Sequence, residues 1–358
     1  MIRCFCLRSF YVALCLFLHT PLLAWSWGFF AHQQINRYAV TTLPPGMFAF
    51  YKTQVPFLTE KAINPDKRRY VVPNEAEKHF IDLEAYFALV LGNEKKTLYQ
   101  AIAMYGQKMI SEHGALPWAV VQVQNQLTQA FRDKDVVRIR QLSADLGHYI
   151  ADAHVPLHTT QNYNGQLSGQ EGIHALWETQ LPLLFFDTYD LLVGQADYIE
   201  DPLEHIWSIV LKSHALAAEA LRIEAQLSKT YPAVFKYSFE QEGVKKNYSV
   251  DYATAYHSAL KGQVENQLRE SILQVGRFWV TAWVNAGSPD LTDLLQNTPP
   301  STRPRRTYRN GPITQKHSKL WNIRHQLASS LPLSFAPWVC FFLRPTGVLA
   351  AGTAATNA

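Results

Sequence analysis

Residues 135–155 read DVVRIRQLSADLGHYIADAHV, and apolar residues recur in this stretch every three or four positions. That spacing is typical of an amphipathic α-helix with one buried face. The same pattern extends outward in both directions, and the helices that it predicts cover residues 31–43, 75–92, 95–112, 116–132, 135–155, 172–185, 203–227 and 252–286. Strand-like alternation is almost absent. The sequence therefore predicts an all-α fold with a single multi-helix domain.

The end of this stretch and the segment after it carry histidines and carboxylates at helical spacing. His148 and Asp152 are four residues apart, as are His174 and Glu178, and His158 lies between the two pairs. Residues four apart on a helix share one face, a turn from each other. Imidazole nitrogens and carboxylate oxygens hold catalytic zinc while leaving a position open for water. Five such residues exceed the needs of one ion, so they predict a multinuclear metal site and a hydrolase.

A simpler interpretation of each pair is a buried histidine that is hydrogen-bonded to a carboxylate. For a single pair that interpretation is the more common one. Two pairs in one short segment, joined by the Gly- and Asn-rich loop NYNGQLSGQEG, favour the metal site. His154 lies only two residues from Asp152 and so points to a different part of the helix, and we leave it out of the site.

Length and charge limit the classes of protein that the chain can belong to. Its 358 residues suffice for one large domain or two small ones with a sizeable core. The net charge is +4, of which residues 1–26 carry +2 and residues 290–358 carry +6, so about −4 remains for residues 27–289. This central region lacks the excess of basic residues expected of a tight polyanion binder.

Residues 1–26 have the features of a secretory signal peptide. Two arginines precede the apolar run YVALCLFLHTPLLA, and small residues come just before Trp27. We expect cleavage after Ser26 and a secreted or periplasmic location, with an uncleaved membrane anchor as the alternative. Of the four cysteines only Cys340 lies outside this segment, so the mature chain cannot form an intramolecular disulfide.

The C-terminal region differs in composition from the rest of the chain. It contains TPPSTRPRRTYRNGP, which is rich in Pro and Arg and has no periodicity, and APWVCFFL, which is too short to span a bilayer. We therefore divide the chain into a signal peptide (1–26), an all-α domain (27–289) and a poorly structured tail (290–358). No function is assigned to the tail.

Four residues upstream of the two pairs are further candidate ligands. The segment WGFFAH contains Trp27 and His32, INPDKRR places Asp66 in a predicted loop, and KHFIDLE places His79 near the start of a predicted helix. With these residues the chain resembles a superfamily of three-zinc phosphodiesterases, which joins the bacterial zinc-dependent phospholipases C to the single-strand-specific nucleases of fungi and plants. In that superfamily the mature chain begins with a tryptophan that binds zinc through its amino group and carbonyl.

The downstream residues match the motifs of the same superfamily. His148, Asp152 and His158 match its His-x3-Asp-x5-His motif, and His174 with Glu178 matches its final His-x3-carboxylate. All nine positions occur in order within residues 27–178. The match of the remaining chain, to about residue 286, rests on helical character alone.

The resemblance implies three zinc ions per chain, bound in a cleft of the helical domain. The ligands of the first would be Asp66, His79, His148 and Asp152. Those of the second would be His158, His174 and Glu178. Those of the third would be the backbone of Trp27, the side chain of His32 and the second oxygen of Asp152, which bridges.

The resemblance also implies a mechanism, in which hydroxide held by the metal ions attacks the phosphorus of a phosphodiester. Closely spaced dications neutralise the phosphoryl oxygens and lower the pKa of bound water toward ~7. The candidate catalytic residues are Asp66, which would orient or deprotonate the water, and Asp152. Just after His79, Asp82 and Glu84 are candidates for orienting the ligand imidazoles; otherwise they form a solvated helix face.

Features of both branches occur, and they leave the substrate open between a phospholipid head group and single-stranded nucleic acid. Glu178 as the last ligand resembles the phospholipases, whereas HFID at His79 and the HALWE segment resemble the nucleases. The lack of disulfides and the acidic central region favour a secreted phospholipase C-like enzyme, with a nuclease as the alternative. We expect transient contact with a membrane surface and no obligate protein partner.

Two further points stay open at this level. Trp118, Tyr163 and Trp177 could stack on a base or surround a cationic head group, although buried packing is the more common role of such residues. A non-catalytic helical binding protein that uses metal only for folding is the third alternative, because metal binding can supply folding energy.

Overall fold

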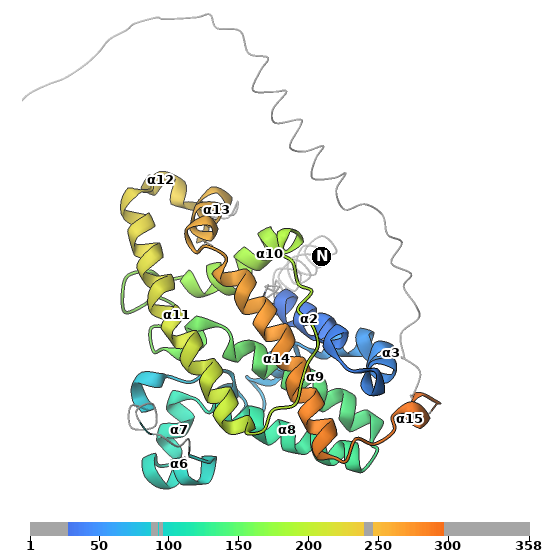
Figure 1. Ribbon diagram of the computed structural model, residues 1–358. Coiled ribbons are helices and arrows are strands. Elements are labelled where there is room, and N and C mark those ends of the chain that lie inside the picture. Colours follow the sequence, from blue (N-terminus) through green and yellow to red (C-terminus); the bar gives the residue numbers. More distant parts are fainter. Residues whose placement is uncertain (1–27, 87–91, 93–95, 240–245, 297–358) are drawn as a thin grey trace, which may run out of the picture. The chain divides into compact units, whose positions relative to one another are not determined.

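Helix α9 (Val136–Ala153) is central to the arrangement of the helices in the computed structural model, which describes residues 28–86, 92, 96–239 and 246–296 (Figure 1). The side chain of Asp135 caps its first turn by accepting a hydrogen bond from the backbone of Arg138. The helix packs against α8 (Leu116–Arg132), α3 (Pro45–Lys61) and α14 (Gln263–Asn285). The all-α prediction is confirmed.

The other elements are mostly short, apart from one long helix. The further α-helices are α2 (Gly28–Ala39), α4 (Asn64–Arg68), α6 (Leu98–Tyr105), α7 (Gln107–His113), α10 (Leu181–Phe185), α11 (Pro202–Thr230), α12 (Ala233–Lys236), α13 (Val250–Ala259) and α15 (Thr292–Gln296). The 3₁₀ helices are η1 (Val40–Thr42), η2 (Ala76–His79), η3 (Leu83–Tyr86), η4 (Pro156–Thr159) and η6 (Phe186–Thr188), and η5 (Ala175–Gln180) is a π-helix. Among the residues that the structure describes, the strands are β1 (Tyr237–Phe239) and β2 (Lys246–Tyr248).

The continuous helix predicted for residues 75–92 is wrong in the part that the structure describes. The 3₁₀ helices η2 and η3 occupy residues 76–86 instead, with an extended break at Phe80. The backbone N–H of Ile81 donates to His158 O at 2.9 Å, and that of Asp82 donates to His113 O at 2.8 Å. These donors bond to distant segments and cannot continue a helix, so tertiary contacts override the helical periodicity.

Glycines divide two other predicted helices. The segment 95–112 breaks at Gly106, whose φ is 84°, and the segment 252–286 breaks at Gly262, whose φ is 83°. Both angles lie in the left-handed region that favours glycine. Helix α3 was not predicted; it begins at Pro45 in its first turn, where the missing N–H costs no hydrogen bond, and it tolerates Pro56 in its interior.

One close helix crossing brings together two of the predicted metal ligands, His32 and His148. A Cβ atom built on Gly147 of α9 would lie 1.9 Å from Asn36 Oδ1 of α2, which is closer than atoms can approach. The Asn36 amide also donates to the backbone oxygen of Ala144 on α9 at 3.0 Å. The absence of a side chain at Gly147 therefore lets α2 pack directly on α9, and the rings of His32 and His148 stack with centroids 4.0 Å apart.

Among the described residues, the fold includes one antiparallel strand pair, with Tyr237 opposite Tyr248 and Ser238 opposite Asn247. Helix α15 lies beyond the predicted domain boundary at residue 289 and packs against α3, and Leu291 before it is buried. All described residues belong to one unit, residues 1–300. The predicted signal peptide and residues 297–358 of the predicted tail lie outside the described residues.

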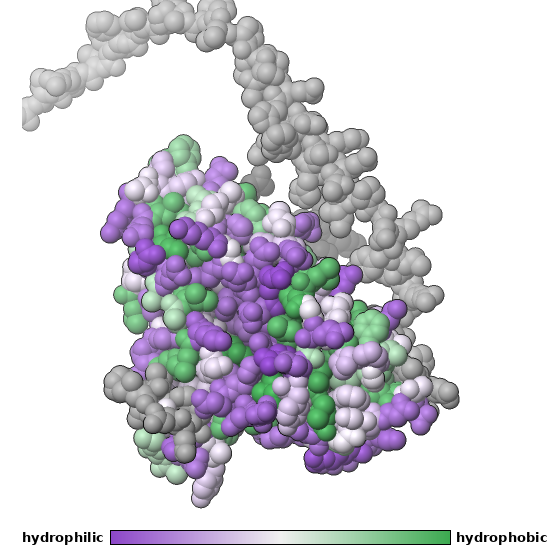
Figure 2. Space-filling view, viewed as in Figure 1, coloured by the Kyte–Doolittle hydropathy of each residue, from purple (hydrophilic) through white to green (hydrophobic). Residues whose placement is uncertain are grey.

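The face of this unit in Figure 2 is mostly hydrophilic, with apolar side chains scattered in small groups. Large apolar side chains such as Trp207, Trp279 and Phe131 are fully buried instead. No helix within the described ranges is long and apolar enough to cross a membrane.

Candidate metal centre

Eight of the nine predicted ligands lie in the described part of the chain, and the fold brings them together from six segments. The side chains come from α2 (His32), α4 (Asp66), η2 (His79), α9 (His148 and Asp152), η4 (His158) and the start of η5 (His174 and Glu178). The ninth, Trp27, lies outside the described residues. Asp66 was predicted in a loop, and it lies instead in the short helix α4.

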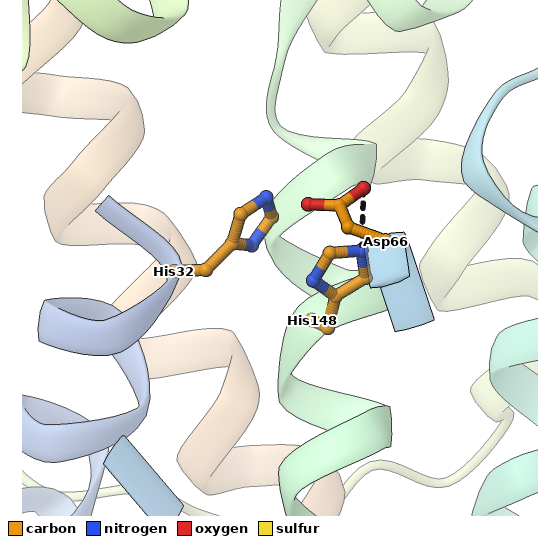
Figure 3. Close-up of side chains that lie close together, drawn as sticks. All are labelled: His32, Asp66 and His148. Atoms are coloured by element: carbon orange, nitrogen blue, oxygen red, sulfur yellow. Dashed lines mark ion pairs between the residues drawn. The ribbon is translucent and has the colours of Figure 1, made fainter. Parts of the chain in front are cut away.

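The inner group consists of Asp66, His79, His148 and Asp152. Asp152 Oδ2 lies 2.9 Å from His79 Nδ1 and 3.2 Å from His148 Nε2. Asp66 Oδ1 lies 3.7 Å from each of these nitrogens. Figure 3 shows Asp66 and His148 turned toward each other, with His32 pointing at them from α2. His79, His148 and Asp152 are almost completely buried, so this group is closed to solvent except at Asp66.

The outer group consists of His158, His174 and Glu178. Glu178 Oε2 lies 2.7 Å from His174 Nε2 and 3.5 Å from His158 Nε2, and the two imidazole nitrogens are 3.2 Å apart. The four-residue spacing of His174 and Glu178 does place them on one face, although the helix is a π-helix. The side chain of His174 is 26% exposed, so the outer group is the more open one.

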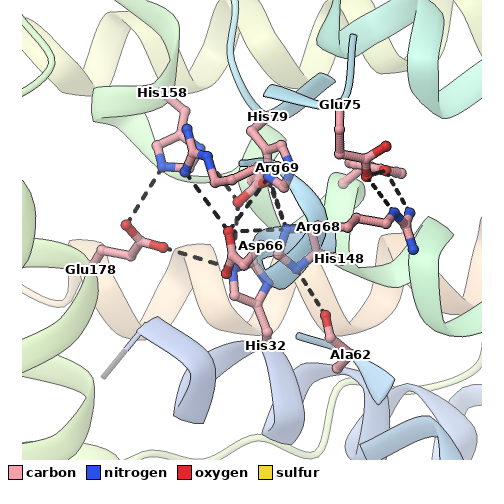
Figure 4. A network of polar contacts seen from close by, with 12 residues as sticks. His32, Ala62, Asp66, Arg68, Arg69, Glu75, His79, His148, His158 and Glu178 are labelled. Carbon is pink, nitrogen blue, oxygen red and sulfur yellow. Dashed lines mark hydrogen bonds and ion pairs between the residues drawn. The ribbon is translucent and has the colours of Figure 1, made fainter. Parts of the chain in front are cut away.

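Asp152 and His32 connect the two groups. The second oxygen of Asp152, Oδ1, lies 3.4 Å from His32 Nε2 and 3.4 Å from His158 Nδ1. His32 Nε2 is also 3.7 Å from Glu178 Oε1 (Figure 4). The two oxygens of Asp152 thus face different histidines. That arrangement is the one that a bridging carboxylate would need.

The start of α2 approaches the same region. A Cβ atom built on Gly28 would lie 3.2 Å from Glu178 Oε1 and 3.7 Å from Thr179 Oγ1. The positive end of a helix dipole therefore faces this carboxylate. Gly28 is the residue next to Trp27, the predicted N-terminal ligand.

The hydrogen bonds of two imidazoles fix which of their nitrogens faces the carboxylates of the centre. His148 Nδ1 lies 2.8 Å from the carbonyl oxygen of Ala62, and His174 Nδ1 lies 3.1 Å from that of Tyr163. A carbonyl only accepts, so each Nδ1 carries the hydrogen and each neutral ring directs the lone pair of Nε2 inward. Those lone pairs face Asp152 and Glu178. Lone pairs that face carboxylates require a proton or a metal ion between them.

The donor set fits metal ions better than protons. The stacked rings of His32 and His148 would repel each other if both were protonated, whereas a shared cation leaves both neutral. In addition, His32 Nδ1 and His79 Nε2 are buried with no hydrogen-bond partner among the described residues. Four groups of three such residues have ligand atoms within 4.8 Å of one another. The buried His, Asp and Glu side chains therefore form a site that could hold metal.

The electrostatics of the centre favour positive charge. Burial lowers the pKa of His148, but the carboxylates of Asp152 and Asp66 outweigh this and raise it to about 9. Burial raises the pKa of Asp152, but the imidazoles of His148 and His158 outweigh this and hold it well below its usual range. The Asp152 carboxylate is thus stabilised as an anion by neighbours that can bind a cation.

Asp82 and Glu84 do not orient the ligand imidazoles. Asp82 Oδ2 lies 3.1 Å from Nδ1 of His113, and Glu84 accepts hydrogen bonds from Thr160 and from the backbone of Gln161. Glu84 therefore supports the segment after His158 rather than an imidazole. The orienting acceptors that the structure shows are backbone carbonyls.

Sequence reasoning also missed Arg69. Its Nη1 lies 3.9 Å from Asp66 Oδ1, and its charge acts on His158. The DKRR run beside Asp66 was the available signal, but a run of charges is more often a solvated surface.

No protein-family model matches this chain, and no curated protein matches its sequence at a significant level. The function is therefore inferred from the residues and geometry of the centre.

Proposed function

We propose that this chain is a secreted zinc-dependent phosphodiester hydrolase of the phospholipase C type, with three zinc ions at the inner group, the outer group and His32. The observation that carries the proposal is Asp152, whose two oxygens face different histidines at 2.9–3.4 Å. A carboxylate in this position can hold two cations close together, as in metal centres that hydrolyse phosphoesters.

The residues of the centre divide the work of such a reaction. Zinc bound here would supply positive charge to neutralise a phosphodiester and would lower the pKa of water toward ~7. Asp66 has the most exposed of the three carboxylates, at 20%, and would orient the attacking water. Arg69 beside it would bind a phosphoryl oxygen, since its planar guanidinium forms paired hydrogen bonds with such groups.

An exposed apolar turn next to the centre favours a phospholipid substrate. Tyr70 and Val71 are 85% and 78% exposed and follow directly after Arg69. Exposed apolar side chains beside cations suit a lipid surface with phosphate head groups. This turn supports the phospholipase alternative over the nuclease.

The nuclease alternative is supported by a different residue. Tyr163 is 54% exposed, and its ring centroid lies 6.1 Å from that of His174. An exposed aromatic ring beside the outer group could stack on a base of single-stranded nucleic acid. If the substrate is single-stranded nucleic acid, replacement of Tyr163 should weaken its cleavage.

The test is a parallel assay of the zinc-loaded protein on phosphatidylcholine vesicles and on single-stranded DNA. We expect release of the phosphorylated head group, and we expect a chelator or His148→Ala to abolish it, because both empty the inner group. His205→Gln is the matched control, since His205 bonds to Gln274 on α14, outside the centre. This control should keep full activity.

Each other result has a definite meaning. Cleavage of DNA alone, weakened by Tyr163→Ala, would replace the phospholipase proposal with the nuclease. Bound metal without turnover of either substrate would contradict both and would favour a non-catalytic role.

A further inference from the structure

A partly buried ionic network lies beside the inner group, and Arg68 is at its centre. Arg68 Nε lies 2.8 Å from Glu75 Oε1, and its Nη1 lies 3.0 Å from Asp145 Oδ2. Its Nη2 donates to the Tyr149 hydroxyl at 3.0 Å. Lys78 binds the other oxygen of Glu75 at 2.9 Å. All three groups of the guanidinium are therefore engaged, each by a different side chain.

The partners of Arg68 lie on the segments that carry the inner ligands. Arg68 itself is two residues after Asp66 in α4, and Glu75 comes four residues before His79 (Figure 4). Tyr149 directly follows His148 in α9. One guanidinium thus ties together the three chain segments that converge on the inner group.

Tyr149 transmits this link to the imidazoles. Its ring meets those of His79 and His148 edge to face, with centroids 5.5 Å and 5.6 Å away. The Tyr149 hydroxyl also donates to Glu75 Oε1, so the ring is held at its far end. A ring that is fixed at one end and packed against two imidazoles limits the positions that these imidazoles can take.

The network carries no charge excess of its own. Arg68 and Lys78 balance Glu75 and Asp145, and both carboxylates are nearly buried. An ion-pair network whose carboxylates are buried contributes little net stability compared with apolar packing, so holding neighbouring groups in one geometry is the better-supported role. Metal sites depend on such outer partners, which fix the orientation of the ligands.

We propose that Arg68 is a positioning residue that sets the spacing of Asp66, His79 and His148 and so controls metal affinity at the inner group. The inference rests on the proposed metal centre, but it does not depend on which phosphodiester is hydrolysed. It predicts a selective effect, because the outer group draws its ligands from η4 and η5, whereas the side chains that Arg68 binds among the described residues are Glu75, Asp145 and Tyr149.

The test is a titration of the metal-free full chain with Co²⁺ and with buffered zinc. Arg68→Met keeps an unbranched apolar stem in place of the arginine methylenes but removes the guanidinium, its charge and all its hydrogen bonds. We expect about 10- to 100-fold weaker binding of the inner equivalent, the usual effect of losing an outer partner. The visible Co²⁺ spectrum of that equivalent should change, whereas binding at the outer group should stay as in the wild type.

Further variants assign the effect to one group. His174→Ala removes an outer ligand and should weaken metal binding at the outer group. In the double variant with Arg68→Met, binding should be weakened at both groups, at each by the same factor as in the single variant. Arg68→Lys keeps the charge without the planar fork and should recover only part of the affinity. If Arg68→Met does not fold, Tyr149→Phe removes a single hydroxyl and should weaken the same equivalent by a smaller factor.

A core variant separates positioning from general stability. Leu127 is fully buried in α8 and belongs to neither group, so Leu127→Ala should lower the melting temperature without changing metal affinity or the Co²⁺ spectrum. If Arg68→Met behaves like Leu127→Ala, the network is only structural and the inference is wrong. If the wild type binds metal as described here but hydrolyses neither substrate, the proposed function fails while the role of Arg68 stands.

Discussion

Two buried carboxylates in this fold, Glu224 and Asp152, differ in the groups that surround their negative charge. Glu224 in α11 accepts hydrogen bonds from Lys236 and Tyr252 at 2.7 Å and from Ser228 at 2.9 Å, and Gln170 binds its other oxygen. The Lys236 ammonium neutralises it directly. Asp152 is equally buried, but its four neighbours at 2.9–3.4 Å are histidines.

At Glu224 the chain supplies the neutralising cation itself, whereas at Asp152 a bound metal ion could supply it. A buried anion needs a cation and hydrogen bonds, and the Glu224 cluster contains both. The centre around Asp152 has two further carboxylates, Asp66 and Glu178, and its remaining ligand candidates are imidazoles, which carry no fixed positive charge. The charge of Glu224 is therefore balanced by protein side chains, whereas the cluster around Asp152 is suited to bind cations.

The largest expected effect comes from Asp152→Asn. An amide has only one acceptor oxygen and no charge, so we expect loss of two metal equivalents together and of nearly all hydrolysis. Metal content by mass spectrometry after dialysis in buffered zinc measures this. Full retention of zinc would show that Asp152 does not bridge. Added zinc should raise the melting temperature of the wild type but raise that of the variant far less, because only bound metal stabilises the folded state.

The opposite pattern is expected for Glu224→Gln. This change leaves the Lys236 ammonium, whose side chain is 13% exposed, without its anion, and breaking a buried pair in this way typically costs about 3–5 kcal/mol. Urea unfolding gives the value, and the metal content should stay unchanged. If the variant loses metal as readily as stability, the two clusters are not independent.

A smaller loss of folding stability is expected when the pH is lowered. Burial raises the pKa of Glu224, but hydrogen bonds from Lys236 and Tyr252 outweigh this and hold it below its usual range. The unfolded state therefore binds the proton more readily. The stabilisation is complete above the ordinary carboxyl pKa of about 4.3 and is lost as the pH falls through the lower folded value.

Unfolding of the metal-free wild type and of Glu224→Gln at a series of pH values tests this. The stability difference between them should be constant above about pH 5 and should shrink below pH ~4.3. A difference that stays constant into strong acid would mean that Glu224 does not titrate in this way.

Local periodicity predicted what depends on local structure. The predicted helix 116–132 coincides with α8 (Leu116–Arg132), and the four-residue spacing of His148 and Asp152 does bring their side chains together. Residues 75–86, the described part of the helix predicted for 75–92, do not form one continuous helix, because backbone N–H groups in this part donate to carbonyls of distant segments. No sequence pattern reports such partners.

The supporting contacts of the centre were missed for the same reason. The carbonyl of Ala62 orients His148 across 86 positions in the chain, and Arg68 reaches Tyr149 across 81. Proximity to His79 in the sequence favours Asp82 and Glu84 as its partners, but in the fold Asp82 pairs with His113 and Glu84 accepts from Thr160. Ligand types can thus be read from the sequence, whereas their outer partners depend on the tertiary structure.

The close crossing at Gly147 has a consequence for how such sites are recognised. The two ligand-bearing helices approach each other to a distance set by a missing methyl group, not by any ligand. A chain with alanine at this position would still display every histidine and carboxylate of the pattern, yet α2 would be pushed away and His32 displaced from His148. A motif defined by its ligands alone would still match that chain. Gly147 therefore belongs in the definition of the motif.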